Sequence, residues 1–239
     1  MVHDPISSKR QRDHLGITFS HIQSILIGYK WILNSIKFNN ALDIGCGEGY
    51  GTEILKEAGA MVVAVDIHLP ALKNINNNEI FRLCADAFKM GIKGSSFDLV
   101  VGSHIIEHFD DCERELFLSE IKRVLRPGGA VFIATPNPAK GFHYQHSGVH
   151  KILYDRDHLN DFLVKYFDFV EFYGVYPCLV YRFIKDFLKI GKQFLNKTGL
   201  LNVRQIQLSI KKTSVETTAL NFSVRKYRPG SQHLIAVCR

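Results

Sequence analysis

Six short apolar runs within residues 40–174 constrain the fold more than any other feature of this sequence. Each run is too short for a helix and is bounded by Gly, Asp or Pro, so each is predicted to be a buried strand. Helical patterns occupy residues 49–57 and 113–125 between them. Strands alternating with helices are typical of an α/β fold with a parallel sheet. The predicted strands are residues 41–44, 61–65, 80–84, 99–102, 130–134 and 167–172.

The composition fits one domain, residues 1–239. A chain of 239 residues that is 46% hydrophobic can build a single core without disulfide or metal staples. Its five cysteines are odd in number and include no C-x-x-C pair, which disfavours a disulfide framework and a zinc knuckle. We therefore expect a cytoplasmic protein, and no run reaches the roughly 20 apolar residues of a membrane span.

Two segments extend beyond a bare α/β unit. The first, residues 1–38, contains apolar positions at helical spacing over residues 19–36 and is predicted to be a helical lid or a packing helix. The second, residues 175–231, is predicted to be a helical insertion before a seventh strand at residues 234–237, because it is too long for a simple connection.

The stretch ALDIGCGEGYG, residues 41–51, is the most informative motif. An apolar strand enters a turn in which Gly45, Gly47 and Gly49 remove side chains where a ligand could approach the backbone. The helix that follows offers free N–H groups at its start. This pattern indicates a nucleotide-type binding turn, and the alternative is an ordinary tight turn between strand and helix.

Two acids at later strand ends favour the binding turn. Asp66 follows the glycine loop by about 20 residues and can accept the ribose hydroxyls of a nucleoside. Asp86, at the end of the third strand, can reach an adenine amine. A dinucleotide fingerprint would require a third glycine where Tyr50 stands. Asp43 would repel a pyrophosphate but can help to order a cationic amine or sulfonium.

The segments LDIGCGEGYGTEIL, VVAVDI, CADA, FDLVVGSHIIEHF and LRPGGAVFIATPNP together resemble the successive motifs of class I S-adenosylmethionine-dependent methyltransferases. The resemblance covers roughly residues 40–174. It implies a doubly wound, seven-stranded, mostly parallel sheet of order 3-2-1-4-5-7-6 with helices on both faces and an antiparallel seventh strand. It also implies S-adenosylmethionine as the cofactor.

The resemblance also assigns cofactor-binding residues. It places the methionine moiety at the glycine loop and Asp43, the ribose at the second strand end, and the adenine at the third strand end. Ser103, at the end of the fourth strand, joins them where cofactor and acceptor should meet. The implied set is Asp43, Gly45, Gly47, Gly49, Asp66, Ile67, Asp86, Ala87 and Ser103.

Three histidines are candidates for catalysis. His104 leaves the fourth strand and could contact the methionine end or the acceptor, while Glu107 and His108 either order this loop or take part in catalysis. H-x-x-E-H also matches an inverted zinc-protease pattern, but its place after a buried strand in this series argues against proteolysis.

His146 and His150 lie in a histidine-rich loop after the fifth strand, beside the expected acceptor pocket. A neutral imidazole there could take the proton from an acceptor hydroxyl, and the alternative is that both only order the loop. We expect no metal site, because no carboxylate accompanies these histidines at a useful spacing.

The excess positive charge is local. Residues 180–212 have a net charge of +7, equal to that of the whole chain. Apolar residues recur there at intervals of three and four with lysines opposite, which is typical of a basic helix at a membrane surface. The alternative is a helix that caps the sheet with its lysines in solvent.

These observations predict an enzyme that methylates a hydroxyl of a small molecule, a saccharide or a lipid-linked acceptor, with peripheral membrane contact through the insertion as an option. The alternative is a non-catalytic nucleoside-binding or membrane-associated interaction module. Nucleic acid is not an expected partner, since the chain has Thr135-Pro136-Asn137-Pro138 in place of an N-P-P-Y-type motif. The sequence fixes neither the acceptor nor the oligomeric state.

Overall fold

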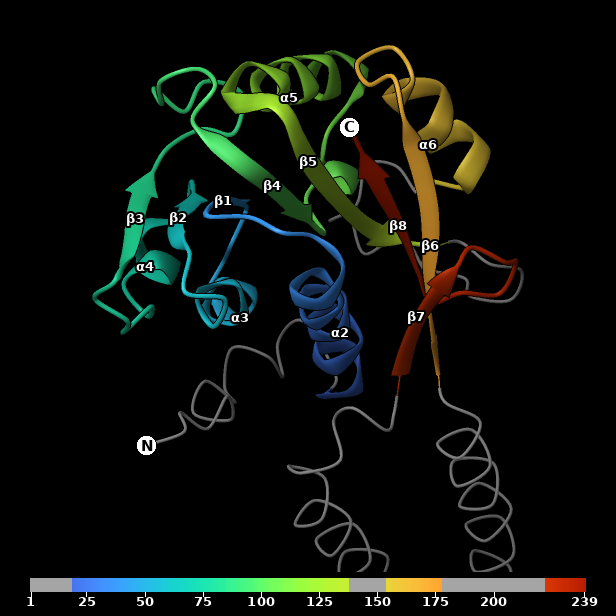
Figure 1. Cartoon of the computed structure of the whole chain (residues 1–239), viewed down its shortest axis with the longest axis horizontal. Coiled ribbons are helices and arrows are strands. Elements are labelled where there is room, and N and C mark those ends of the chain that lie inside the picture. The colour runs from blue at the N-terminus through green and yellow to red at the C-terminus, as the bar shows by residue number, and fades with distance from the viewer. Residues whose placement is uncertain (1–18, 138–153, 178–221) are drawn as a thin grey trace, which may run out of the picture.

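A single eight-stranded sheet forms the centre of the protein (Figure 1). The computed structural model describes residues 19–137, 154–177 and 222–239. The strand order is β3-β2-β1-β4-β5-β8-β6-β7, in which the first five are parallel and β8, β6 and β7 pair antiparallel with their neighbours. The strands are β1 (Asn40–Ile44), β2 (Met61–Asp66), β3 (Ile80–Cys84), β4 (Phe97–Ser103), β5 (Leu125–Pro136), β6 (Val170–Pro177), β7 (Phe222–Lys226) and β8 (His233–Cys238).

The predicted strand order is confirmed, with one addition. The predicted seventh strand is β8, which runs antiparallel between β5 and β6. The sequence analysis missed β7, which falls inside the predicted insertion and extends the sheet by pairing antiparallel with β6. Only Phe222 of β7 is fully buried, so this edge strand carries little hydrophobic signal.

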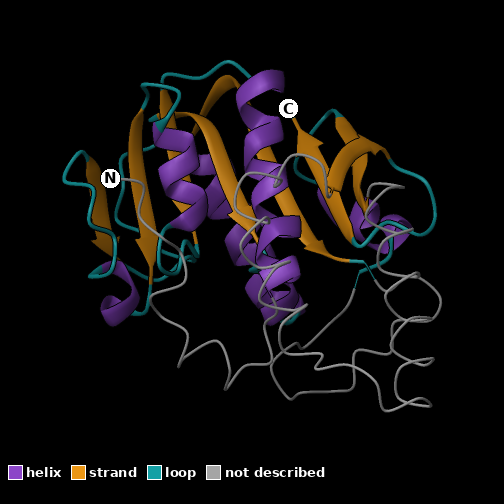
Figure 2. Cartoon of the chain, turned by 90° about the horizontal axis from the view of Figure 1, so that it is seen from below, coloured by secondary structure: helices purple, strands orange, loops and turns teal. Residues whose placement is uncertain are grey.

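Helices cover both faces of the sheet, as predicted (Figures 1 and 2). Helices α2, α3 and α4 pack on one face, whereas α5 and α6 pack on the other. A short 3-10 helix, η1, follows β4. The bounds are α2 (Phe19–Ser35), α3 (Tyr50–Lys56), α4 (Leu69–Leu72), η1 (Ile106–His108), α5 (Asp111–Val124) and α6 (Arg156–Leu163).

The sheet separates two hydrophobic clusters. Along β5, Val131 and Ile133 pack in the cluster beneath α5, while Phe132 and Ala134 pack in the cluster beneath α2. Successive side chains of a strand point to opposite faces, so a strand covered on both faces needs apolar residues at every position. This requirement explains why the central strands appear in the sequence as continuous apolar runs.

The start of the fifth strand differs from the prediction. The sequence predicted a helix to residue 125 and a strand from residue 130, but α5 ends at Val124 and β5 begins at once. Phe97 pairs with Leu125 and Leu99 with Ala130, so residues 126–129 lie opposite a single residue of β4. The Pro-Gly-Gly segment therefore forms a bulge within the strand.

The sixth strand also begins later than predicted. The backbone N–H of Phe167 donates to the carbonyl of Leu163 at 3.0 Å, so Phe167 closes the end of α6 and does not start a strand. Pairing begins at Val170, opposite Cys238 of β8. Phe167 is buried at the end of the helix, where it is 5% exposed, and in the sequence this apolar residue extends the run that predicts a strand.

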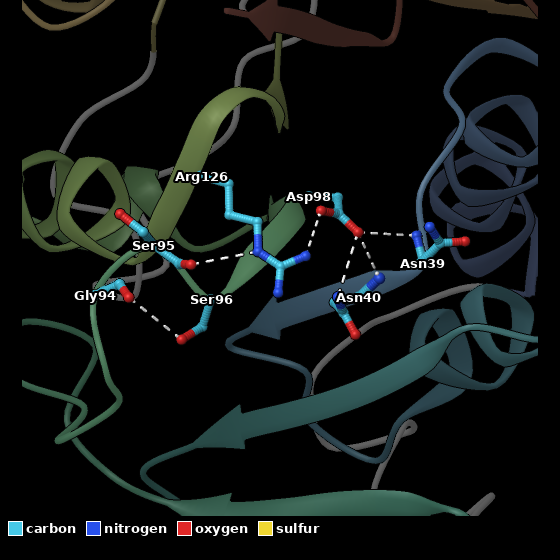
Figure 3. A network of polar contacts seen from close by, with 7 residues as sticks. All are labelled: Asn39, Asn40, Gly94, Ser95, Ser96, Asp98 and Arg126. Carbon is cyan, nitrogen blue, oxygen red and sulfur yellow. Dashed lines mark hydrogen bonds and ion pairs between the residues drawn. The ribbon is translucent and has the colours of Figure 1, made fainter.

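A polar network joins the amino ends of β1, β4 and β5 (Figure 3). One carboxylate oxygen of Asp98 accepts the backbone N–H groups of Asn39 and Asn40 at 3.0 and 2.9 Å, and the other accepts Arg126 Nη1 at 2.8 Å. Burial alone would raise the pKa of Asp98, but these hydrogen bonds outweigh it and lower the pKa. The bulge in β5 thus places Arg126 where it ties three parallel strands together.

Helix α2 packs against the sheet. Its residues Tyr29, Ile32 and Ile36, the last just beyond its end, belong to the same buried cluster as Leu55 of α3 and Phe132 of β5. Of the two roles predicted for this helix, a lid or a packing helix, the structure of α2 shows packing against the sheet. Residues 1–18, the histidine-rich loop at 138–153 and the basic segment at 178–221 lie outside the described residues, and the proposed division of the chain stays a prediction.

Candidate cofactor and active site

A cavity of about 390 Å³ opens at the carboxyl ends of β1, β2, β3 and β4. The strand order reverses between β1 and β4, and ligands of open α/β sheets bind at such a switch point. The volume lies within the range of small-molecule sites, roughly 300–1,000 Å³. The lining residues are Ile44, Gly45, Val65, Asp66, Ile67, Ala85, Asp86, Ala87, Phe88, His104, Ile105, His108 and Phe109.

The glycine loop is shaped by packing as well as by space for a ligand. Gly45 and Gly49 have φ angles of +70° and +81°, which L side chains rarely adopt. A Cβ at Gly45 would lie 2.6 Å from Ile105, and one at Gly49 would lie 2.6 Å from Ile75. At Gly47 a Cβ would meet nothing within 4 Å. Packing and backbone conformation therefore both require glycine at positions 45 and 49, while at Gly47, with a φ of +55°, only the backbone conformation favours it.

Asp66 has two tasks at this site. One carboxylate oxygen accepts the backbone N–H of Gly47 at 2.8 Å, and the other accepts that of His68 at 2.8 Å. An ionised carboxylate has about four acceptor positions, so each oxygen retains one for a ligand hydroxyl. The same side chain thus holds the glycine loop and faces the cavity, where the sequence predicted contact with a ribose.

Asp86, Ala87 and Ile67 form the neighbouring part of the wall. One oxygen of Asp86 accepts the backbone N–H of Phe88 at 2.9 Å, which orients the carboxylate. Ile67 is 74% exposed, so its apolar side chain is available for contact with a bound ligand. The structure brings these three predicted residues together with Asp66 and Gly45.

Four predicted cofactor residues, Asp43, Gly47, Gly49 and Ser103, are absent from the lining. Asp43 is 1% exposed and accepts hydrogen bonds from the hydroxyls of Tyr29 and Thr52 at 3.0 and 2.6 Å. Burial raises the pKa of Asp43 to about 6, although both hydrogen bonds act in the opposite direction. Ser103 is 8% exposed. Their contact with a cofactor stays a prediction.

His104 is the one predicted catalytic residue within the described chain, and it lines the cavity. It has a φ of +57°, an uncommon value for a residue with a side chain, and its N–H donates to Ala134 O at 2.7 Å. This bond crosses from the end of β4 to β5 and fixes the backbone at the site. The other two candidates, His146 and His150, lie outside the described residues.

The sequence analysis missed the aromatic part of the wall. The rings of Phe88 and Phe109 lie 4.8 Å apart in an edge-to-face arrangement, and both residues line the cavity. Each follows a recognised polar residue, Phe88 two positions after Asp86 and Phe109 directly after His108. That proximity was the available signal, but an aromatic residue in a loop does not by itself predict which way its ring points.

The side chains of this site fit S-adenosylmethionine. The cavity combines two strand-end carboxylates with an apolar and aromatic wall, which suits a nucleoside that presents a diol, an amine and a flat ring. The open space at Gly47 leaves the loop accessible at one point. Asp66 would hold the ribose and Asp86 the adenine, while Ile67 and Phe88 would cover its ring.

In the part of the chain that the structure describes, no helix is long and apolar enough to cross a membrane. Within the same residues, no group of three or more His, Cys, Asp or Glu side chains is arranged to hold a metal ion.

Known proteins resemble this chain in sequence. Residues 42–133 match the family described as a methyltransferase domain. A probable S-adenosylmethionine-dependent methyltransferase of Mycobacterium tuberculosis is 33% identical over 100 residues, which are 41% of this chain and 36% of that protein. A ubiquinone biosynthesis O-methyltransferase of Rhizobium etli is 34% identical over 105 residues, 40% of each chain. The chain thus spans less than half the length of the curated relatives that it matches.

Solved structures resemble the whole chain. A SAM-dependent methyltransferase from Archaeoglobus fulgidus has a TM-score of 0.64 at 18% identity, covering 97% of this chain and 99% of that one. A possible histamine N-methyltransferase from Thermotoga maritima has a TM-score of 0.66 at 13% identity, covering 96% and 95%. At these identities the likeness shows the fold. Together with the matched sequence family and the cavity, it identifies the chain as carrying a class I S-adenosylmethionine-dependent methyltransferase domain.

Proposed function

We propose that this protein transfers the methyl group of S-adenosylmethionine to a hydroxyl oxygen of a small-molecule, saccharide or lipid-linked acceptor. The observation that carries the proposal is the cavity in which Asp66, Asp86 and His104 line one continuous wall. In this proposal the carboxylates bind the donor, and the imidazole of His104, at the end of β4 in the same cavity, is a candidate to meet the acceptor. Relatives named as ubiquinone biosynthesis O-methyltransferases support oxygen as the acceptor atom.

The main contribution that this reaction needs from the protein is alignment of the methyl donor with the acceptor oxygen. When bound, S-adenosylmethionine supplies an electrophilic methyl group on a sulfonium. Holding the two reactants in line can provide much of the acceleration. A general base is needed only to remove the proton of a weakly acidic alcohol. His104, His146 and His150 are the proposed candidates for that base.

Calorimetry tests the donor site. Asp66→Ala removes two charge-assisted hydrogen bonds to the ribose, so we expect S-adenosylmethionine binding to weaken by about 2–4 kcal/mol. Ile67→Ala should also weaken binding, while Leu116→Ala, at another exposed apolar position, this one on α5, should not. Unchanged affinity in a folded Asp66→Ala variant would contradict the ribose assignment. NADH binding as tight as that of S-adenosylmethionine would favour a dehydrogenase.

Methyl transfer itself is tested with a labelled cofactor and fractionated cell extracts. The proposal expects the label in a lipid, glycan or small-molecule pool. The bond that holds the labelled methyl group should have the chemical stability of an ether. Label in nucleic acid would contradict the proposed acceptor class. Binding of the cofactor without transfer into any pool would favour the alternative, a non-catalytic nucleoside-binding module.

A further inference from the structure

The carboxyl group of Asp43 is buried beneath the glycine loop without a positive partner. Asp43 is 1% exposed, and its two oxygens accept the hydroxyls of Tyr29 and Thr52, which are both uncharged donors. Among the residues that the structure describes, no Lys, Arg or His forms an ion pair with Asp43. Buried carboxylates are normally paired, because an uncompensated charge in the protein interior is costly. The described chain thus supplies Asp43 with hydrogen bonds but with no countercharge.

The cofactor cavity adjoins this carboxyl group along β1. Ile44 and Gly45, the two residues that follow Asp43, line the cavity. The described lining includes the carboxylates of Asp66 and Asp86 but no Lys or Arg, so the permanent charges of this wall are negative. S-adenosylmethionine carries a sulfonium and an ammonium against one carboxylate and is therefore a net cation. Both the wall and Asp43 favour a ligand of that charge.

The groups that face Asp43 from each neighbouring element determine what can titrate with it. Tyr29 of α2 and Cys46 of the glycine loop stay neutral, because burial raises the pKa of both. Thr52 of α3 does not titrate, and β4 pairs with Asp43 through an apolar residue. Asp66 of β2 is an acid, and its negative charge raises the pKa of Asp43. The charged neighbour of Asp43 in the described chain is thus a second carboxylate.

Burial and Asp66 bring the titration of Asp43 close to neutral pH. Together they raise its pKa to about 6, although the hydrogen bonds from Tyr29 and Thr52 act in the opposite direction. Near pH 6 the free protein therefore holds Asp43 as a mixture of neutral acid and carboxylate. A cation in the adjoining cavity stabilises the carboxylate alone and so lowers this pKa. Binding of a cation and loss of the Asp43 proton are then linked, and each favours the other.

We propose that Asp43 is a buried proton switch for the methyl donor, which releases its proton to solvent when S-adenosylmethionine occupies the cavity and then serves as a countercharge to the sulfonium. The inference rests on the proposed function, since it takes S-adenosylmethionine as the donor. It needs no contact between Asp43 and the ligand, because charges interact across several ångströms of protein interior. S-adenosylhomocysteine lacks the sulfonium charge and should leave the proton on Asp43. The switch thus helps the protein to distinguish its donor from its product.

Calorimetry of S-adenosylmethionine binding at pH 6 measures the proton release directly. The titration is repeated in phosphate, MES and imidazole buffers at equal ionic strength, because their different heats of ionisation enter the measured enthalpy in proportion to the protons released. We expect about half a proton per donor bound, since about half of the Asp43 groups are protonated at that pH. With S-adenosylhomocysteine we expect no dependence on the buffer. Equal proton release for the two ligands would overturn the proposal.

Asp43→Asn separates this group from the histidines of the cavity wall, His104 and His108, which experience the same ligand charge. The variant keeps both histidines, so it should lose most of the proton release that the wild type shows. Glu115→Gln, which removes one negative charge on the exposed side of α5, is the matched control and should retain the release. Undiminished release by folded Asp43→Asn would overturn the assignment to Asp43.

Tyr29→Phe provides a second variant that decides the matter if Asp43→Asn does not fold. It removes a hydrogen bond that lowers the pKa of Asp43. The pH at which proton release is greatest should therefore move upward in Tyr29→Phe. A folded variant in which this pH is unchanged would contradict the role of Asp43.

The affinities follow from the same linkage. At pH 7 Asp43→Asn should bind S-adenosylmethionine about tenfold more weakly than the wild type does, as expected when binding shifts the pKa of Asp43 by about one unit. At pH 5 the difference should shrink to about twofold, because the wild type is then largely protonated as well. For S-adenosylhomocysteine the two proteins should differ by less than about twofold at both pH values.

The outcomes separate this inference from the proposed function. A wild-type protein that binds S-adenosylmethionine without releasing a proton would overturn the inference alone. Failure of the wild type to bind S-adenosylmethionine at any pH would overturn the proposed function and this inference with it.

Discussion

The hydroxyl of Tyr29 donates a 3.0 Å hydrogen bond to the carboxylate of Asp43, and so joins helix α2 to the strand that enters the glycine loop. Both side chains are buried, and the Tyr29 ring lies over Gly51, where a Cβ would be 2.2 Å from it. A helix that precedes the sheet in sequence therefore helps to fix the loop that faces the cofactor cavity.

Tyr29→Phe should destabilise the protein by about 1–3 kcal/mol, because it leaves a buried carboxylate oxygen without this donor. Urea unfolding followed by circular dichroism measures the change. Tyr176→Phe is the control, since its hydroxyl binds the carbonyl of Arg228 at an exposed site. A loss no greater than the control's would show that the Asp43 contact contributes little.

Asp43 should make stability fall as pH rises from about 4 to about 6. Its pKa is raised from an ordinary value of 3.8 to about 6, so the folded state holds the proton more tightly than the unfolded state in this window. The stabilisation, at most about 3 kcal/mol, is complete below the unfolded pKa and is lost above the folded one.

Asp43→Asn should remove this dependence. Carboxylates with lowered pKa values, such as Asp98 and Glu120, have the opposite sign, and their contribution is lost only at lower pH. Free energies of unfolding at half-unit pH intervals provide the test. Identical slopes for the two proteins between pH 4.5 and 6 would contradict the assignment.

Gly49→Ala should destabilise the fold much more than Gly47→Ala. Both positions have positive φ, but only at Gly49 would the new methyl group lie 2.6 Å from a buried side chain, that of Ile75. Overpacking of this kind costs roughly 1–3 kcal/mol beyond the backbone strain. Thermal unfolding of both variants measures the difference.

A double-mutant cycle shows whether the contact with Ile75 is the cause. Ile75→Ala alone creates a cavity and should destabilise the protein, but combined with Gly49→Ala it removes the clash. The two changes should therefore be less destabilising together than the sum of each alone. If the losses of stability of the two single variants simply add, the destabilisation by Gly49→Ala comes from backbone strain and not from the contact with Ile75.

The basic segment at residues 180–212 carries a prediction that rests on sequence alone. If it contacts anionic lipid, the protein should sediment with anionic vesicles at low salt, since each Lys or Arg near such a surface contributes about 1 kcal/mol. Lys185→Glu with Lys189→Glu should abolish sedimentation and leave the melting temperature nearly unchanged. Salt should act likewise by screening.

The alternative for this segment gives the opposite result. A helix that caps the sheet would bury Phe187, so Phe187→Asp would destabilise the protein. Absence of sedimentation by the unmutated protein at low salt would exclude the membrane contact.

The central fold was predictable because it depends on local patterns. Strands buried on both faces appear as continuous apolar runs, and their order followed from recognised motifs. Elements whose stability depends on a partner were not predictable. β7 pairs along the edge that β6 offers, and the bulge at residues 126–129 occurs together with the contact between Arg126 and Asp98. Neither relationship is visible in a stretch of sequence.

The site was predictable to the same extent. Asp66, Asp86 and Gly45 were found because residue type and strand-end position together specify them, and all three line the cavity. Asp43 has the expected residue type, but the structure shows that it is buried and accepts hydrogen bonds from Tyr29 and Thr52. The contact between Glu107 and His104 could be suspected from their spacing, but its geometry depends on Thr135 and His233 from distant strands.

Pro177 at the end of β6 pairs with Phe222 at the start of β7, so both ends of the intervening segment are held by one strand pair. Opposed residues of an antiparallel pair lie roughly 5 Å apart, so Pro177 and Phe222, which flank residues 178–221, lie close together at one edge of the sheet. Segments inserted at such a point can change in length or composition without altering the strands that flank them. In this protein the two points of attachment of that segment, on β6 and β7, lie at the other end of the strand order from β1, β2 and β3, whose carboxyl ends line the donor cavity.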